Sequence, residues 1–91
     1  MRDQRRPTTF ERKVYAAVRH IPKGQTQTYQ WVARQIGKPR AARAVGNALN
    51  RNPYAPHVPC HRVVRSDGSL GGYAKGPARK RFLLRREGAI K

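Results

Sequence analysis

Short helical patterns interrupted by proline and glycine fill the first half of this sequence and constrain its fold more than any other feature. Between residues 8 and 50, apolar side chains recur three or four positions apart in three stretches, which are separated by "PKG" at 22–24 and "GKP" at 37–39. This spacing places apolar side chains on one face of a helix, and each break ends a helix after a few turns. The pattern predicts a small, mainly α-helical domain.

The first helix should begin at a capping box, because Thr8 precedes Glu11 by three residues. We expect residues 1–7 to be a flexible basic tail and residues 8–91 to form one domain. The apolar face of this helix, which should lie in the core, consists of Phe10, Val14, Ala17, Val18 and Ile21.

The next two helices predict a helix-turn-helix, because they are short and joined by a glycine-containing turn. The second of them should run from about Arg40 to Asn50. Other helical hairpins share this pattern, so it does not by itself identify a DNA-binding element. The expected apolar faces are Trp31, Val32 and Ile36 on one helix and Ala41, Ala44, Val45 and Leu49 on the other.

A β-hairpin is predicted after these helices. Val63 and Val64 favour a strand, "SDGS" at 66–69 favours a turn, and Leu70 would lie on the returning strand. A hairpin beside a helix-turn-helix would form a wing. The expected fold class is therefore mainly α with a short β-hairpin, similar to a winged helix-turn-helix.

The last helix should begin at Pro77, which suits a first helical turn, and end at Gly88. Its apolar run, Phe82, Leu83 and Leu84, is expected to face the core. This helix completes the predicted domain.

The formal charge of +17, from 21 Lys and Arg against 4 Asp and Glu, indicates a polyanionic partner, because such an imbalance is otherwise costly in self-repulsion. Nucleic acid is the leading candidate, and a basic ribosomal or solubility surface is the alternative. A membrane partner fits less well, since no strongly apolar helix face accompanies the charge. No apolar run is long enough for a membrane span or a signal peptide, so we expect an intracellular protein, cytoplasmic, nucleoid-associated, or nuclear in a eukaryote.

Cys60 is the only cysteine, so it can form no internal disulfide, and its surroundings lack the ligand spacing of a zinc site. We expect no metal and no cofactor. His61 follows it directly, and Arg62 and Arg65 lie close in sequence. An imidazole and positive charge favour the reactive thiolate. The alternative is a buried cysteine that acts as a small apolar residue.

A working Cys and His pair usually has a third group that orients the imidazole. Of the four acidic residues, Asp3 lies in the tail, Glu11 belongs to the capping box, and Asp67 is roughly 20 Å from His61 along an extended strand. Glu87 remains, at a helix end where the helix dipole disfavours an acid. It is the candidate partner of His61, and the alternative is that it only pairs with one of the many arginines.

Several longer strings support a family resemblance. "PCHRVV", preceded by "KPRAARAVGNALNRNP" and followed by "GGYAKGPARKRFLLRREG", closely resembles the DNA-binding, catalytic domain of the O6-alkylguanine-DNA alkyltransferases. The resemblance implies direct, irreversible repair, in which a damaged guanine is flipped from the duplex and its O6-alkyl group moves to Cys60. It also implies that His61 draws off the thiol proton through a water while Glu87 holds the imidazole.

The same resemblance implies roles for four further residues. Asn52 ties the helix-turn-helix to the active-site loop, and Tyr29 helps to rotate the nucleotide and donates to the departing guanine. Arg43 enters the base stack as an arginine finger, which would partly offset the cost of base extrusion. Tyr73 closes the guanine pocket.

The resemblance also describes the rest of the pocket and the DNA contact. Val63 offers its backbone and Ala74 its amide, and Lys75 could narrow the pocket against bulky adducts. The recognition helix would lie in the minor groove and read little sequence. The expected DNA-binding residues are Arg40, Ala41, Arg43, Ala44, Gly46 and Asn47.

Three functions follow as hypotheses. The first is a single-turnover alkyltransferase acting on double-stranded DNA that contains O6-alkylguanine, as a monomer. The second is a non-catalytic alkyltransferase-like protein that binds the lesion, which the presence of Cys60 argues against. The third is a small winged-helix regulator, which leaves the grouping of Cys60, His61 and Glu87 unexplained.

Overall fold

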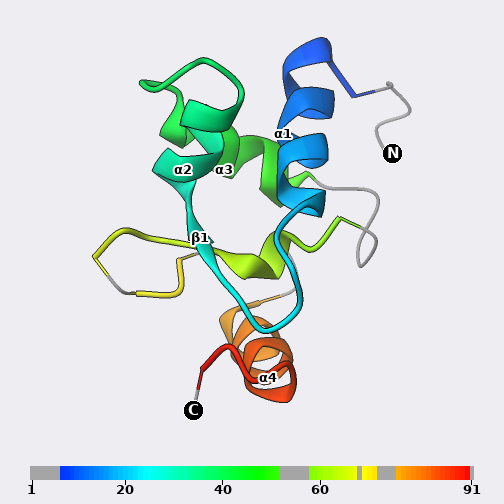
Figure 1. Cartoon of the computed structure of the whole chain (residues 1–91), viewed down its shortest axis with the longest axis vertical. Helices are drawn as coiled ribbons and strands as arrows, with labels where there is room; N and C mark the ends of the chain where they lie inside the picture. The colour runs from blue at the N-terminus through cyan, green and yellow to red at the C-terminus, as the bar shows by residue number, and fades with distance from the viewer. Residues whose placement is uncertain (1–6, 52–57, 68, 72–75, 91) are drawn as a thin grey trace.

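The computed structural model describes residues 7–51, 58–67, 69–71 and 76–90 (Figure 1). The mainly helical class is confirmed, and no helix within these ranges is long and apolar enough to cross a membrane. The elements in chain order are α1 Thr9–Arg19, β1 Gln27–Thr28, α2 Tyr29–Gln35, α3 Ala42–Asn50, the 3-10 helix η1 Cys60–Arg62, β2 Val63–Val64 and α4 Pro77–Arg86.

Helix α1 begins at the predicted capping box. The Glu11 amide donates to Thr8 Oγ1 at 3.1 Å, and the Thr8 amide donates to Glu11 Oε1 at 2.9 Å. These two bonds satisfy backbone donors that a helix start otherwise leaves without partners. On the inner face, the Tyr15 hydroxyl donates to the Ala48 carbonyl at 2.7 Å and fixes α1 against α3.

Helices α1, α2 and α3 pack together in one half of the molecule (Figure 1). One predicted core position is wrong, because Ala44 is exposed, whereas Val45, Ala48 and Leu49 form the inner face of α3. The buried residues of this half continue into the segment before β2. The core cluster consists of Val14, Tyr15, Val18, Ile21, Val32, Ala33, Val45, Ala48, Leu49, Val58, Cys60 and Val63.

The predicted β-hairpin is also wrong. Strand β2 pairs in parallel with β1, with Val63 opposite Gln27 and Val64 opposite Thr28. This pairing carries the fully buried Val63 side chain into the core, which a solvent-exposed wing would not do. None of the described residues between 65 and 71 belongs to a strand, and the Arg65 amide donates to the Ser69 carbonyl at 3.1 Å.

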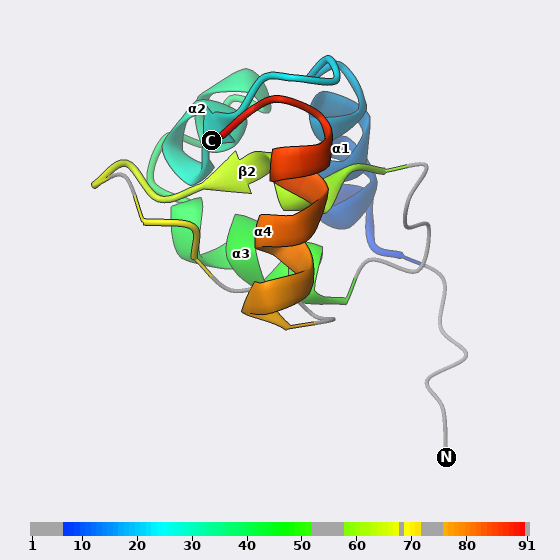
Figure 2. The same cartoon turned by 90° about the horizontal axis from the view of Figure 1, so that it is seen from below.

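Helix α4 begins at Pro77 and ends before Gly88, as predicted. Gly88 has φ +80°, and the Ala89 amide donates to the Leu84 carbonyl at 2.9 Å, which is the bond pattern of a glycine-ended helix. Leu84 is buried, but Phe82 is 50% exposed, which corrects the expectation that it faces the core. Two residues apart on a helix are about 200° apart, so both cannot point inward. Figure 2 shows α4 from the side that it presents to solvent.

Candidate active site

Cys60 opens the short helix η1, directly before β2. The residue is 6% exposed and belongs to the core cluster, so the segment is held by packing as well as by the sheet. The parallel register sets β2 beside β1, and Tyr29 follows β1 at the start of α2. The two-stranded sheet therefore brings the chain around Cys60 next to the chain around Tyr29.

His61 and Glu87 lie together, as predicted, although 26 positions separate them in the sequence. His61 Nε2 is 3.0 Å from Glu87 Oε2, and both side chains are largely buried. Glu87 caps the C-terminal end of α4, which packs against η1. The end of α4 thus delivers the carboxylate to the imidazole.

Arg62 holds the same carboxylate in a fork. Its Nε donates to Glu87 Oε1 at 2.9 Å and its Nη2 donates to Oε2 at 2.7 Å, while Nη1 donates to the Ile21 carbonyl at 2.9 Å. These hydrogen bonds from Arg62, with a smaller effect from His61, lower the pKa of Glu87 to about 2. Glu87 is therefore ionised at neutral pH, and the positive charge of Arg62 stabilises this carboxylate.

The protonation state of His61 follows from its neighbours. Burial lowers its pKa below the ordinary value, and this effect exceeds the opposing effect of Glu87, so the ring is neutral at neutral pH. The ionised carboxylate of Glu87 only accepts hydrogen bonds, so Nε2 carries the ring proton. Nδ1 then holds the lone pair. A neutral imidazole oriented in this way is able to accept a proton from a thiol.

Lys80 is a site residue that was not predicted from the sequence. Its side chain is completely buried, its Nζ donates to the Val63 carbonyl at 2.6 Å, and the ammonium lies 5.8 Å from the centre of the Tyr29 ring. Burial lowers its pKa to about 8, although a negative charge on Cys60 would raise it. The ammonium is thus within electrostatic range of the sulfur. One signal was present in the sequence, because Lys80 lies four residues before Leu84 on the inner face of α4.

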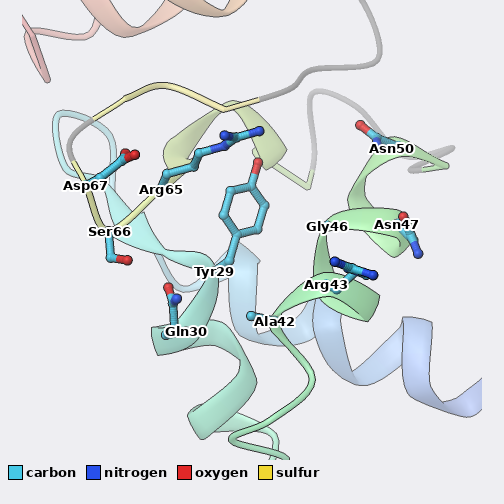
Figure 3. Close-up of a pocket in the computed structure, with 10 residues that line it drawn as sticks. All are labelled: Tyr29, Gln30, Ala42, Arg43, Gly46, Asn47, Asn50, Arg65, Ser66 and Asp67. Carbon is cyan, nitrogen blue, oxygen red and sulfur yellow. The ribbon is translucent and has the colours of Figure 1, made fainter.

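A pocket of about 470 Å³ opens beside Tyr29 (Figure 3). In Figure 3, the Tyr29 ring points into the space between α3 and the loop that carries Arg65. Four of the predicted residues, Tyr29, Arg43, Gly46 and Asn47, contribute to its wall. Its full lining is Tyr29, Gln30, Ala42, Arg43, Gly46, Asn47, Asn50, Arg65, Ser66 and Asp67.

Tyr29 lies at the pocket and within electrostatic range of Cys60. It lines the pocket, and burial raises the pKa of its hydroxyl, with a negative charge on Cys60 acting in the same direction. Gly71 allows the ring to sit there, because a Cβ on Gly71 would lie 3.0 Å from Tyr29 Oη and its φ is +77°. The hydroxyl therefore remains protonated and able to donate at neutral pH.

Some of the other predicted site residues are described by the structure, and the rest lie outside the described residues. Arg40 is exposed just before α3, Ala41 is the N-cap of this helix, and Ala44 is exposed within it. Val63 uses its carbonyl to accept from Lys80. The predicted Asn52, Tyr73, Ala74 and Lys75 lie outside the described residues.

Metal-binding donors are not gathered at this site. Within the ranges that the structure describes, no group of three or more His, Cys, Asp or Glu side chains could hold a metal ion. Cys60 instead directly precedes His61 in the chain, and the His61 imidazole contacts the Glu87 carboxylate. This arrangement suits proton transfer and nucleophilic attack by sulfur.

Comparisons with known proteins agree with this geometry. A family model described as 6-O-methylguanine DNA methyltransferase, DNA binding domain, matches residues 9–89. The methylated-DNA--protein-cysteine methyltransferase of Methanosarcina acetivorans is 52% identical over 82 residues, which cover 90% of this chain and 53% of that protein. The chain spans about half the length of the curated relatives that it matches first.

Solved structures give the same result. The Mycobacterium tuberculosis OGT in complex with DNA has a TM-score of 0.89 at 50% identity, covering 92% of this chain and 52% of that one. The S. pombe Atl1 in complex with damaged DNA containing O6-carboxymethylguanine has a TM-score of 0.81 at 39% identity, covering 92% and 80%. These matches confirm the family resemblance found in the sequence.

Proposed function

The chain belongs to the family described as 6-O-methylguanine DNA methyltransferase, DNA binding domain, and we propose that it repairs duplex DNA by moving the alkyl group of O6-alkylguanine to Cys60. The observation that carries this proposal is the placement of Cys60 directly before His61, whose Nε2 is 3.0 Å from the ionised Glu87. A purely structural cysteine needs no such neighbours.

The proposed reaction begins with the thiol proton. Cys60 gives this proton through a water to Nδ1 of His61, whose positive charge Glu87 then stabilises across the 3.0 Å contact. The sulfur attacks the alkyl carbon, so that a carbon–sulfur bond forms while the bond from carbon to O6 breaks. The bonding electrons stay on guanine, which finally gains a proton in place of the alkyl group. The net change moves one alkyl group to sulfur and one proton to guanine.

Tyr29 and Lys80 would stabilise the negative charges of the reaction, which lie on the departing guanine and on the sulfur. The Tyr29 hydroxyl stays protonated and can donate to the departing guanine, which makes guanine a better leaving group. The Lys80 ammonium lies within electrostatic range of the sulfur and would interact favourably with its negative charge once the thiol proton has left. The product is a thioether, whose carbon–sulfur bond is stable because a thiolate is a poor leaving group from a neutral thioether. Each molecule is thus expected to react once.

The pocket beside Tyr29 would receive the extruded nucleotide while α3 contacts the minor groove. This part of the proposal is supported by small or exposed residues on the outer side of α3, because small side chains permit close approach in a narrow groove. Arg43 lines the pocket and would occupy the space that the base leaves. We expect one copy of the chain to bind each lesion, which sedimentation of the complex will test.

Mass spectrometry after incubation with a duplex that contains one O6-methylguanine tests the proposal. The intact protein should gain one methyl group, the peptide with Cys60 should carry it, and the DNA should contain unmodified guanine. The variant Cys60→Ser should bind the same duplex and gain nothing. Binding to the lesion by the native chain without any adduct would instead support the lesion-binding hypothesis, and equal binding to undamaged DNA would support the regulator.

A further inference from the structure

Helix α4 has a second face that the alkyl transfer does not use. Its inner face carries Lys80 and Leu84, both completely buried. The opposite face is exposed and is here called the α4 face. It consists of Arg79, Arg81, Phe82, Arg85 and Arg86.

Phe82 lies at the centre of the α4 face. On a helix, positions three and four apart are neighbours, so Arg79, Arg85 and Arg86 surround its ring. The guanidinium of Arg79 lies 5.5 Å from the ring centre. Phe82 is also the one large apolar side chain that is exposed among the residues described. An aromatic ring set among arginines is the combination that single-stranded nucleic acids bind, through stacking of a base and contacts to phosphates.

Each acidic side chain among the described residues has a partner outside the α4 face. Glu11 binds Arg51, Asp67 accepts from Ser69, and Glu87 binds His61 and Arg62. Helix α4 itself, from Pro77 to Arg86, contains no acidic residue. The charge of the α4 face is therefore complementary to a polyanion.

The α4 face is separate from the pocket and from α3. No residue of α4 lines the pocket. In Figure 1, α4 lies at one end of the molecule and α2 and α3 lie at the other, with β1 between them. A duplex held on α3 would thus leave the α4 face accessible.

We propose that the α4 face is a second nucleic-acid-binding surface, which binds single-stranded DNA while α3 holds a duplex. The four arginines contact successive phosphates, and an unpaired base stacks on Phe82. A duplex offers phosphates but no unpaired base, so the exposed ring favours the single strand. This surface does not depend on the chemistry of Cys60, and the variant Cys60→Ser should retain it.

Fluorescence anisotropy of a labelled oligothymidylate tests this proposal with the full chain already saturated by an unlabelled duplex. The oligothymidylate should still bind. Replacing the four arginines of the α4 face by glutamine should weaken this binding by about tenfold or more and reduce the salt slope by about 0.7 for each phosphate that is no longer neutralised. Glutamine is a good helix former, so α4 should stay folded, which a thermal melt will check.

A matched variant removes four exposed charges elsewhere. It carries glutamine at Arg12, Lys13, Arg19 and Lys23, on and just after α1. This variant should bind the oligothymidylate far better than the α4 variant does. Equal weakening in both would show that only total charge matters and would overturn the proposal.

Substitution of the ring completes the test. Phe82→Leu keeps an apolar side chain but removes stacking, and should weaken oligothymidylate binding by about fivefold or more, whereas Phe82→Trp should not. Both should transfer methyl from duplex DNA as the native chain does. The proposal fails if Phe82→Leu binds normally, or if the duplex displaces the oligothymidylate from the native chain.

Discussion

Glu11 and Glu87 are both largely buried carboxylates, with 11% and 12% of their side chains exposed, and each accepts two hydrogen bonds from one arginine. Their surroundings differ. Arg51, the partner of Glu11, is 57% exposed, whereas Arg62, the partner of Glu87, is 15% exposed. Glu11 also caps α1 through Thr8, while Glu87 also contacts His61.

The difference shows how one kind of ion pair serves two purposes. The pair of Glu11 and Arg51 ties α1 to the end of α3, and the exposed arginine limits its value to about 1 kcal/mol or less. The pair of Glu87 and Arg62 keeps a carboxylate ionised beside an imidazole. In the proposed reaction, the important effect of this pair is that Glu87 orients His61. Matched substitutions of Glu87 and Glu11 can separate this effect on the reaction from effects on stability.

Glu87→Gln should have the largest effect on alkyl transfer. Glutamine keeps the size of the side chain but removes the negative charge that stabilises protonated His61, so the single-turnover rate should fall by about 10²–10⁴-fold. Binding to the duplex should be unchanged. Quenched-flow measurement of methyl transfer at saturating DNA, together with a binding titration, gives both quantities.

Glu11→Gln is the control for this prediction. It makes the same change in a carboxylate of equal burial, and glutamine still supports a capping box. We expect a loss of stability of about 1 kcal/mol or less and no change in the transfer rate. If both substitutions slow the transfer equally, His61 does not depend on Glu87, and the proposed role of Glu87 is wrong.

Lys80 is a third buried ionisable residue to compare with Glu11 and Glu87. Its ammonium donates a hydrogen bond to the Val63 carbonyl. Lys80→Met removes the cation near Cys60 and should slow transfer by about a hundredfold. Stability should change by less than about 2 kcal/mol, since loss of the hydrogen bond is offset by relief from burying a charge. In the native chain the rate should also decline above pH 8, as Lys80 loses its proton, and this decline should be absent in the variant.

Lys13→Met is the matched control for Lys80→Met, because Lys13 is exposed on α1. It should alter neither the rate nor its pH dependence. A transfer rate in Lys80→Met equal to that of the native chain, with the alkaline decline retained, would remove Lys80 from the site.

The pH dependence below neutrality separates His61 from Glu87. Burial lowers the pKa of His61 below its ordinary value of 6.5, so transfer should fall by about tenfold per pH unit once the pH is below this lowered value. The pKa of Glu87 is lowered from 4.5 to about 2, so its contribution to stability is present above pH 4.5 and is lost as the pH falls toward 2. Between pH 4.5 and 6.5, a fall in rate with unchanged Trp31 fluorescence therefore reports His61. A rate that stays flat down to the pH at which Trp31 fluorescence reports unfolding would argue against His61 as the base.

The same contrast explains what the sequence could predict. The capping of α1 by Thr8 and the ending of α4 before Gly88 depend on hydrogen bonds within a few residues, so their patterns are visible in the sequence. Glu87 could be singled out because the chain has few acids. The partner of β2 was not predicted, since a strand of two residues at Gln27–Thr28 has no periodic pattern of its own.

The sequence also could not predict which residue of an apolar or basic run is buried. Phe82 and Leu84 look equally apolar, and only the packing of α4 on η1 decides which one points inward. Lys80 is one of 21 basic residues, and its spacing of four residues from Leu84 is a weak signal while the sequence does not show which apolar residue of this run points inward. Its environment comes from Tyr29, Cys60 and Val63, which lie on other segments.

Arg43 gives the smallest expected effect, because its role concerns delivery of the base and leaves the chemistry of Cys60 untouched. It lies exposed on α3 at the pocket wall, whereas the side chain of Arg62 is only 15% exposed. Arg43→Ala should slow repair of O6-methylguanine in duplex DNA by about fivefold to tenfold, since the space left by the extruded base is no longer filled. Reaction with a free O6-alkylguanine base should be unchanged, because a free base needs no extrusion, whereas Glu87→Gln should slow both reactions. Equal losses by Arg43→Ala in repair and in binding to undamaged duplex would reduce Arg43 to a phosphate contact.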